Sequence, residues 1–225
     1  MLVDRYYDAV KALLEKARTT QDDAIYKAAD VIATAVESGK KVYLSRICHQ
    51  IEHDLIYRGG GPIFYKEYKE NEVELKEGDV LVVSSVSGRT KSVVDLAFDS
   101  VAKGVKVIAF TSMEYARAVD PVHESGKKLY EMATVTVDNC APAAEAMLEV
   151  EGIEARFAAA SGIASDFLMW CITSRVVERM LADGYTPGIL KSANFPDGND
   201  YNKTVVEQFV PISSPLSKRV QTLCG

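Results

Sequence analysis

The sequence is poor in the features that mark secreted, membrane-bound and nucleic-acid-binding proteins. Its cysteines are few and scattered, without a CxxC pair: Cys48, Cys140, Cys171 and Cys224. This spacing argues against a disulfide framework and a zinc site, and it is typical of reduced thiols in a cytoplasmic protein. No apolar run approaches the length of a membrane span, and the N-terminus lacks the layout of a signal peptide. We therefore expect a cytoplasmic location and no membrane partner.

Basic residues are also in the minority. The chain has 26 Lys and Arg against 32 Asp and Glu, which gives a net charge of −6. A general nucleic-acid binder carries a basic face, so we expect no nucleic-acid partner. The 225 residues, 48% of them hydrophobic, fit one α/β domain with attachments. We place this domain at residues 1–210 and expect a flexible tail over 211–225.

Apolar spacing along the chain indicates alternating strands and helices. Helical periodicity predicts helices over residues 2–18, 21–37, 49–57, 91–103 and 161–183. Short apolar runs predict strands over residues 41–44, 63–65, 79–84, 105–110 and 133–137. Residues 140–160 fit either a hairpin or irregular structure. Because strands alternate with helices, the expected fold is α/β, with a doubly wound parallel sheet.

The loop between residues 84 and 91 is the most informative segment. It places the hydroxyls of Ser85, Ser87 and Thr90 around Gly88, after a buried strand and before a helix. Loop amides, hydroxyls and the positive end of a helix together suit a phosphate and need no metal. The alternative is that Ser87 and Thr90 only cap the helix and Gly88 makes a turn. The loop lacks the Gly-Lys-Ser/Thr ending and the three-glycine fingerprint of nucleotide sites, so a phosphorylated small molecule is favoured and no cofactor is expected.

Two further strand ends carry polar side chains. Thr111 and Ser112 follow the strand over 105–110, and Asp138 and Asn139 follow the strand over 133–137. In a doubly wound sheet the ligand lies beyond the carboxyl ends of the strands. We therefore expect these residues to lie near the Ser85–Thr90 loop.

The Ser85–Thr90 run matches the Ser-x-Ser-Gly-x-Thr phosphate loop of sugar isomerase (SIS) domains. About residues 1–209 resemble a branch of this superfamily distantly similar to phosphoheptose isomerases, most clearly at residues 57–61, 85–90, 106–112, 123–131, 137–139 and 191–194. The resemblance implies a three-layer α/β/α sandwich around a sheet of about five strands, with residues 1–38 packing on or across a dimer. It also implies a homodimer or homotetramer with a phosphorylated sugar bound between subunits. Ser85, Ser87 and Thr90 would hold its phosphate, with Thr111 and Ser112 beside them.

The chain departs from this family after its first strand. Related proteins usually have a glycine-rich turn there, whereas this chain has Leu44-Ser45-Arg46-Ile47-Cys48-His49. Bulky residues remove the close backbone approach that glycines permit. Either Arg46 takes over an anion contact through its fork of donors, or this side of the pocket has changed its use.

Acid/base candidates are few. Aldose–ketose isomerisation moves a proton between neighbouring carbons, which one carboxylate or imidazole can do. We rank His49 first and Glu52 second, because the helix expected over 49–57 starts at the carboxyl end of a strand. His49 and His53 would share one helix face, but His-x-x-Glu-His is not a zincin motif, and we expect no metal. The alternative for Glu52 is a solvated helix face.

His123 is the third acid/base candidate. It lies in a predicted loop, where an exposed histidine without a role is the alternative, and the resemblance supports it because matching members carry histidine here. The neighbouring Lys127 and Lys128 would either face solvent or attract an anionic substrate.

The remaining candidates are groups that would bind a polyol. Asp138, Asn139 and Asn194 offer partners for sugar hydroxyls, and Ser161 is either a plain N-cap or a further sugar contact. The sequence thus predicts a cofactor-independent isomerase of a sugar phosphate. A phosphosugar lyase or etherase and a non-catalytic sugar-phosphate sensor are the alternatives.

Overall fold

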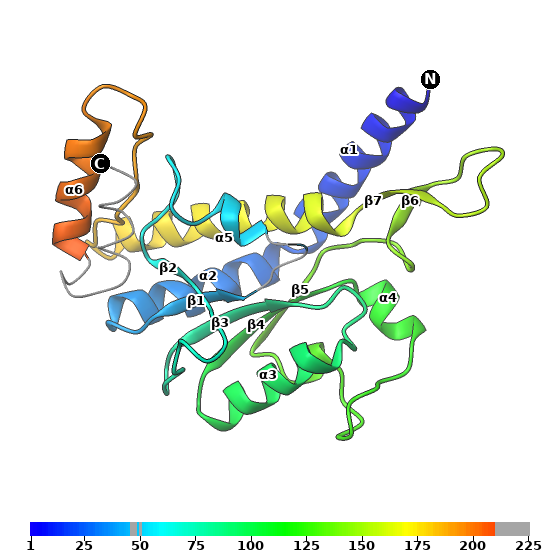
Figure 1. Cartoon of the computed structure of the whole chain (residues 1–225), viewed down its shortest axis with the longest axis horizontal. Coiled ribbons are helices and arrows are strands. Elements are labelled where there is room, and N and C mark those ends of the chain that lie inside the picture. The colour runs from blue at the N-terminus through cyan, green and yellow to red at the C-terminus, as the bar shows by residue number, and fades with distance from the viewer. Residues whose placement is uncertain (46–48, 50, 210–225) are drawn as a thin grey trace.

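A parallel β-sheet forms the centre of the molecule. The computed structural model describes residues 1–45, 49 and 51–209 (Figure 1). In spatial order the five strands are β2 (Tyr65–Glu67), β1 (Val42–Ser45), β3 (Val80–Ser84), β4 (Lys106–Thr111) and β5 (Val135–Asp138). Every neighbouring pair is parallel. The doubly wound parallel sheet expected from the sequence is confirmed.

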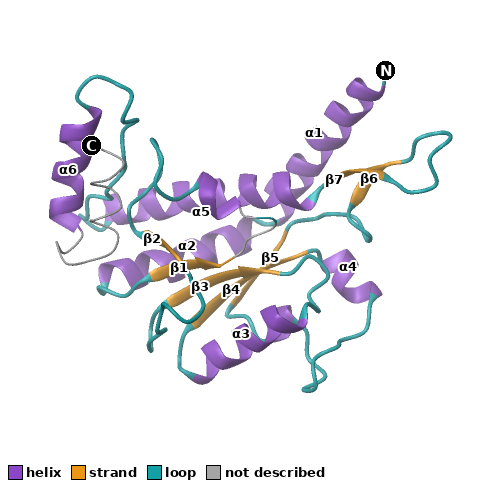
Figure 2. Cartoon of the chain, viewed as in Figure 1, coloured by secondary structure: helices purple, strands orange, loops and turns teal. Residues whose placement is uncertain are grey.

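Helices cover both faces of this sheet. On one side α2 (Asp22–Glu37) and α5 (Ser161–Ala182) lie over the sheet, while α1 (Leu2–Thr20) extends beyond it (Figure 1). On the other side lie α3 (Lys91–Ala102) and α4 (Met113–Ala118) (Figure 2). The 3₁₀ helix η2 (Leu129–Glu131) packs on this side too, with Leu129 in the same core as α3. The chain is therefore a three-layer α/β/α sandwich.

The buried strand β3 shows why its sequence is continuously apolar. Val80 and Val82 point into the core shared with α2 and α5. Leu81 and Val83 point into the core shared with α3. Because successive strand residues face opposite sides and both sides are covered, none of these positions meets water.

The helix predicted over residues 49–57 is wrong. The described part of this segment contains only the 3₁₀ helix η1 (Ile51–Asp54). His49 has φ 67° and Tyr57 has φ 57°, and these values belong to the left-handed region. A right-handed helix cannot pass through either residue, so apolar spacing alone was misleading here.

Other differences concern short or peripheral elements. Residues 140–160 contain an antiparallel hairpin of β6 (Ala146–Leu148) and β7 (Phe157–Ala159), the first of the two alternatives. The sequence analysis missed α4, which is too short for a periodic signal, and α6 (Gly198–Phe209). The predicted tail, 211–225, lies outside the described residues. Within them, no helix combines the length and apolar character needed to cross a membrane.

Candidate functional site

The Ser85–Thr90 loop is closed by its own hydroxyls. The hydroxyl oxygens of Ser85 and Thr90 are 2.9 Å apart, and the Thr90 amide donates to Ser85 Oγ at 3.2 Å. Between them the Gly88 amide donates to the Ser85 carbonyl at 2.8 Å, and Gly88 has φ 68°. Thr90 is the N-cap of α3. The loop is therefore a compact turn that leads directly into a helix.

Neighbouring segments fix the direction of the loop carbonyls. The Val86 carbonyl accepts from the Ser112 amide at 2.9 Å and from Thr111 Oγ1 at 3.1 Å. The Gly88 carbonyl accepts from the Leu129 amide at 2.8 Å. In a trans peptide the carbonyl and the following N–H point in opposite directions. The amides of the next residues in the chain are thus turned away from α4 and η2.

The loop and the first turn of α3 offer several unused donors. Within the described residues, the amides of Ser87, Arg89, Lys91 and Ser92 donate to no protein group. The Ser87 hydroxyl, which is half-buried, also has no partner in this part of the structure. Converging amides at a helix N-terminus carry partial positive charge. The loop and the start of α3 therefore present unused donors together with the positive end of the helix.

Thr111 and Ser112 lie beside the loop, and both side chains are fully buried. Thr111 holds the loop through the Val86 carbonyl. Ser112 caps α4 by accepting from the Tyr115 amide, and it donates to the Ala141 carbonyl at 2.6 Å. These two hydroxyls therefore hold the strand ends together.

Asp138 and Asn139, at the end of β5, form hydrogen bonds with neighbouring segments in the same region. Asp138 Oδ1 accepts from the amides of Met113 and Cys140, at 3.0 and 2.8 Å. Asn139 is fully buried, accepts from the Ala141 amide and donates to Ser165 Oγ at 3.3 Å. The predicted convergence at the carboxyl edge is present, with these side chains engaged by the protein.

The last two polyol candidates lie elsewhere. Ser161 is fully buried at the start of α5, where its hydroxyl donates to Glu145 Oε1 at 2.5 Å. Asn194 is exposed in a turn before α6. Neither residue lines the cavity described below.

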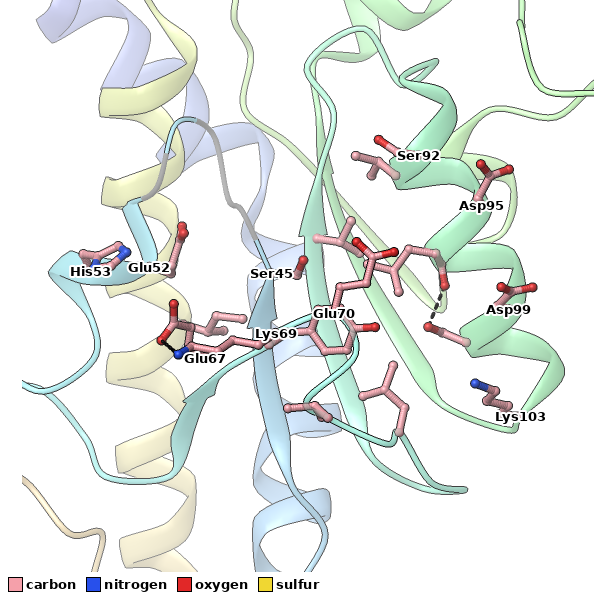
Figure 3. Close-up of a pocket in the computed structure, with 18 residues that line it drawn as sticks. Ser45, Glu52, His53, Glu67, Lys69, Glu70, Ser92, Asp95, Asp99 and Lys103 are labelled. Carbon is pink, nitrogen blue, oxygen red and sulfur yellow. Dashed lines mark hydrogen bonds and ion pairs between the residues drawn. The ribbon is translucent and has the colours of Figure 1, made fainter. Parts of the chain in front are cut away.

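A cavity of about 510 Å³ opens between η1, the strand ends and α3. Glu52 and His53 of η1 lie on one side, Ser92 and Asp95 of α3 lie on the other, and Ser45 at the end of β1 lies between them (Figure 3). Glu52 is only 5% exposed, whereas His53 is exposed. The cavity thus joins a buried carboxylate to the first turn of α3, whereas residues 85–90 of the preceding loop do not line it.

The first acid/base candidate, His49, is exposed and does not line this cavity. Its positive φ places it in a turn rather than on the helix face expected from the sequence. Arg46, the proposed substitute anion ligand, lies outside the described residues.

His123 is attached to the outer flank of α3. Its Nε2 lies 2.9 Å from Asp95 Oδ1, and its Nδ1 lies 2.7 Å from Ser125 Oγ. Its side chain is 8% exposed and stacks near the Phe98 ring, at 5.8 Å between ring centroids. Its connection with the cavity runs through Asp95, which lines it.

The same histidine belongs to a cluster of metal-ligating side chains. Asp95, His123 and Glu124 place ligand atoms within 4.8 Å of one another. However, Lys91 Nζ lies 2.9 Å from Asp95 and 3.2 Å from Glu124. The hydrogen bond from Lys91 is the main cause that lowers the pKa of Asp95. The lysine thus already supplies the positive charge that a metal would bring.

Some cavity residues were missed by the sequence analysis. Ser45, Ser92 and Asp95 line the cavity, and only Ser45 had a signal, as a hydroxyl at the end of a strand. Asp166 on α5 is another missed group, because its Oδ1 is buried without a hydrogen-bond partner. Burial, followed by the charge of Asp54, raises the pKa of Asp166, and Arg58 opposes this shift.

Comparisons with known proteins agree with this architecture. Residues 5–50 and 54–112 match the SIS domain family. The fold resembles a phosphoheptose isomerase from Francisella tularensis, with a TM-score of 0.53 and 14% identity over 78% of this chain and 96% of that chain. It also resembles the Vibrio vulnificus NanR protein complexed with ManNAc-6P, with a TM-score of 0.54 and 13% identity over 95% of this chain and 70% of that chain. The chain therefore has the three-layer fold of SIS domains, and the match to that family lies in its N-terminal half.

Sequence relatives define the family within this class. A UPF0309 protein of Halalkalibacterium halodurans is 30% identical over 226 residues, which cover 88% of this chain and 93% of that protein. A UPF0309 protein of Shouchella clausii is 29% identical over 235 residues, which cover 92% of this chain and 96% of that protein. The chain belongs to the UPF0309 family.

Proposed function

We propose that this protein binds a sugar phosphate and interconverts its aldose and ketose forms. The phosphate would be held by the loop over 85–90 and the first turn of α3. The observation that carries the proposal is that Ser92, in that turn, and the buried Glu52 line the same cavity. A volume of about 510 Å³ is ample for a hexose phosphate.

The chemistry requires one group that moves a proton. A base removes the proton from C2 of the open-chain sugar and returns it to C1 of the enediol, while the proton of the C2 hydroxyl passes to the oxygen on C1. Glu52 is our proposed base, because its carboxylate lines the cavity opposite the α3 turn. No cofactor takes part in this proposal.

The histidines have secondary roles in the proposal. His49 would donate the proton that assists ring opening, since it lies two residues before η1. His123 would act from the far side of α3 through Asp95, to which its Nε2 is bound. Arg46, Asp138, Asn139, Ser161 and Asn194 remain proposed sugar contacts.

A second copy of the chain is part of the proposal. The apolar side chains of Leu2, Val3, Tyr6 and Phe157 are 40, 72, 39 and 50% exposed and surround a hollow between α1 and β7. Contiguous exposed apolar surface of this kind marks interaction sites. We propose that it is covered in a homodimer or homotetramer, and that the protein works in the cytoplasm, where scattered thiols stay reduced.

Solvent proton exchange tests the reaction directly. The full-length protein would be incubated in D₂O with a panel of hexose, heptose and amino-sugar phosphates, including ManNAc-6P. We expect deuterium to enter C2 of at least one compound, as seen by NMR. Glu52→Gln should abolish this exchange and leave binding of the same compound intact, because the amide keeps the shape of the side chain but cannot accept the proton.

Glu70→Gln is the matched control, since Glu70 lines the same cavity and is exposed. It should keep full exchange activity. If Glu52→Gln exchanges deuterium as fast as the wild type, Glu52 is not the base. Cleavage of a phosphosugar ether without interconversion would instead support the lyase alternative.

Binding without turnover is the second candidate function. It is favoured by the sequence at the end of β1 and directly after it, where bulky Leu44 and Arg46 stand in place of the small residues usual in related proteins. Tight binding of a sugar phosphate by calorimetry, with neither exchange nor product, would support this sensor role.

A further inference from the structure

Lys128 is a buried cation behind the Ser85–Thr90 loop. It is 9% exposed, whereas its neighbour Lys127 is exposed. Lys128 Nζ donates to the Ala116 carbonyl oxygen at 2.6 Å. Ala116 itself faces the loop, because a Cβ on Gly88 would lie 3.2 Å from the Ala116 Cβ. The ammonium group is therefore bound to a residue that contacts the loop.

The charge of this lysine is incompletely compensated within the described residues. An ammonium group has three donors, and only one acceptor for it is present there, a neutral carbonyl. The nearby carboxylate of Glu131 accepts from the Lys128 backbone amide at 2.8 Å and makes no ion pair with Nζ. Burial of a cation is costly unless an opposite charge offsets it. The positive charge of Lys128 is therefore not neutralised by a neighbouring carboxylate and can favour an anion bound at the loop.

The Lys128 backbone is tied to the loop as well. Its Cβ would lie 3.8 Å from a Cβ on Gly88, and the next amide, that of Leu129, donates to the Gly88 carbonyl at 2.8 Å. Because the Gly88 carbonyl points toward η2 in this bond, the Arg89 amide points away from η2. Lys128 thus stands directly behind the donors that would face a phosphate.

We propose that Lys128 is a positioning residue whose buried charge makes the loop selective for dianions such as a phosphate monoester. The inference rests on the proposed phosphate site and assigns it an electrostatic partner. Lys128 need not touch the ligand. The electric field of its ammonium group is poorly screened in the protein interior. It therefore strengthens the binding of a dianion more than the binding of a monoanion.

Titration calorimetry with inorganic phosphate and sulfate tests this role in the full chain. Lys128→Met should weaken binding of both anions by about tenfold to a hundredfold, the range for losing a charge-assisted interaction. Lys128→Arg should restore most of the affinity because it keeps the charge. Lys127→Met is the matched control and should bind as the wild type does.

A merely structural lysine would give another pattern. Lys128→Met would then unfold at a lower temperature but bind phosphate with unchanged affinity, and that result would overturn the inference. A wild-type chain that binds neither anion would overturn the proposed phosphate site together with it. If the wild type binds the anions and Lys128→Met binds them equally tightly, the phosphate site stands and only the role of Lys128 is overturned.

Should Lys128→Met fail to fold, the wild type still decides the matter. In the ¹⁵N-lysine-labelled chain, the Nζ signal of Lys128, identified by its loss in Lys128→Arg, should shift on phosphate addition. The Lys127 signal should not shift. A Lys128 signal that stays fixed while phosphate binds contradicts the inference.

Discussion

The hydroxyl oxygens of Ser85 and Thr90 lie 2.9 Å apart, so the two ends of the loop between β3 and α3 are joined by their own side chains. The hydroxyl of Ser87, between them, has no such partner in the described part of the chain. The three hydroxyls of this loop therefore differ in their hydrogen bonding. Two of them keep the loop closed, and the third is available to a ligand.

Ser87→Ala should weaken binding of phosphorylated sugars by about 1–3 kcal/mol, because a hydrogen bond to a charged group is lost. The unfolding temperature should stay close to that of the wild type, since Ser87 makes no bond within the described residues. Calorimetry against the compound found by the exchange screen measures the affinity. Ser174→Ala, at an exposed position of α5, is the control. An affinity equal to that of the wild type would argue against a Ser87 contact.

Gly88→Ala should damage both stability and ligand binding. Gly88 has φ 68°, and an added Cβ would lie 3.2 Å from the Ala116 Cβ and 3.3 Å from Thr111 Oγ1. Gly126 has a similar φ of 70° but nothing within 4 Å of an added Cβ. Gly126→Ala should therefore cost only the backbone strain, about 1–2 kcal/mol, and Gly88→Ala should cost more. Urea unfolding of both variants compares the two, and equal losses would contradict the close packing behind the loop.

Asp166→Asn should raise the unfolding temperature at pH 7. The pKa of Asp166 is raised by burial and then by the charge of Asp54, so the folded chain holds the proton more tightly than the unfolded chain. The contribution of Asp166 to stability is then present at low pH and is lost as pH rises through the folded pKa. The neutral amide avoids this loss, and its advantage should vanish below about pH 4, where the carboxyl is protonated in both states.

Thermal unfolding between pH 3 and pH 7 measures this effect. Asp23→Asn is the control, because the Asp23 side chain is 95% exposed on α2. It should show little change at any pH. A variant at position 166 that is less stable than the wild type at pH 7 would mean that the ionised carboxylate is stabilised in the fold.

Val3→Asp should lower the molecular mass of the protein in solution. Val3 is 72% exposed beside the apolar hollow between α1 and β7, and a charge there would be buried at the proposed interface between copies. Val101→Asp, at a 44% exposed position on α3, is the control and should keep the wild-type mass. Light scattering measures both, and a monomeric wild type would exclude this interface.

Much of the fold could be predicted from local patterns. Continuous apolar runs such as 79–84 mark strands buried on both faces, and helical spacing correctly indicated the helix over 161–183. These signals are local because burial imposes a repeat on each element. The same reasoning failed at residues 49–57, since the positive φ of His49 and Tyr57 leaves no trace in apolar spacing.

The sequence by itself determined the layered α/β fold and the position of the Ser85–Thr90 loop at a helix start, because both depend on neighbours along the chain. Only the tertiary structure decided how individual polar groups are used. Thr111 and Asp138 bind backbone groups of other segments, and Lys128 is buried while Lys127 is exposed. Burial and hydrogen-bond partners depend on which distant segments of the chain meet in the fold. The chemistry of a hydroxyl or an ammonium group does not reveal this, because buried and exposed groups of the same type are alike in sequence.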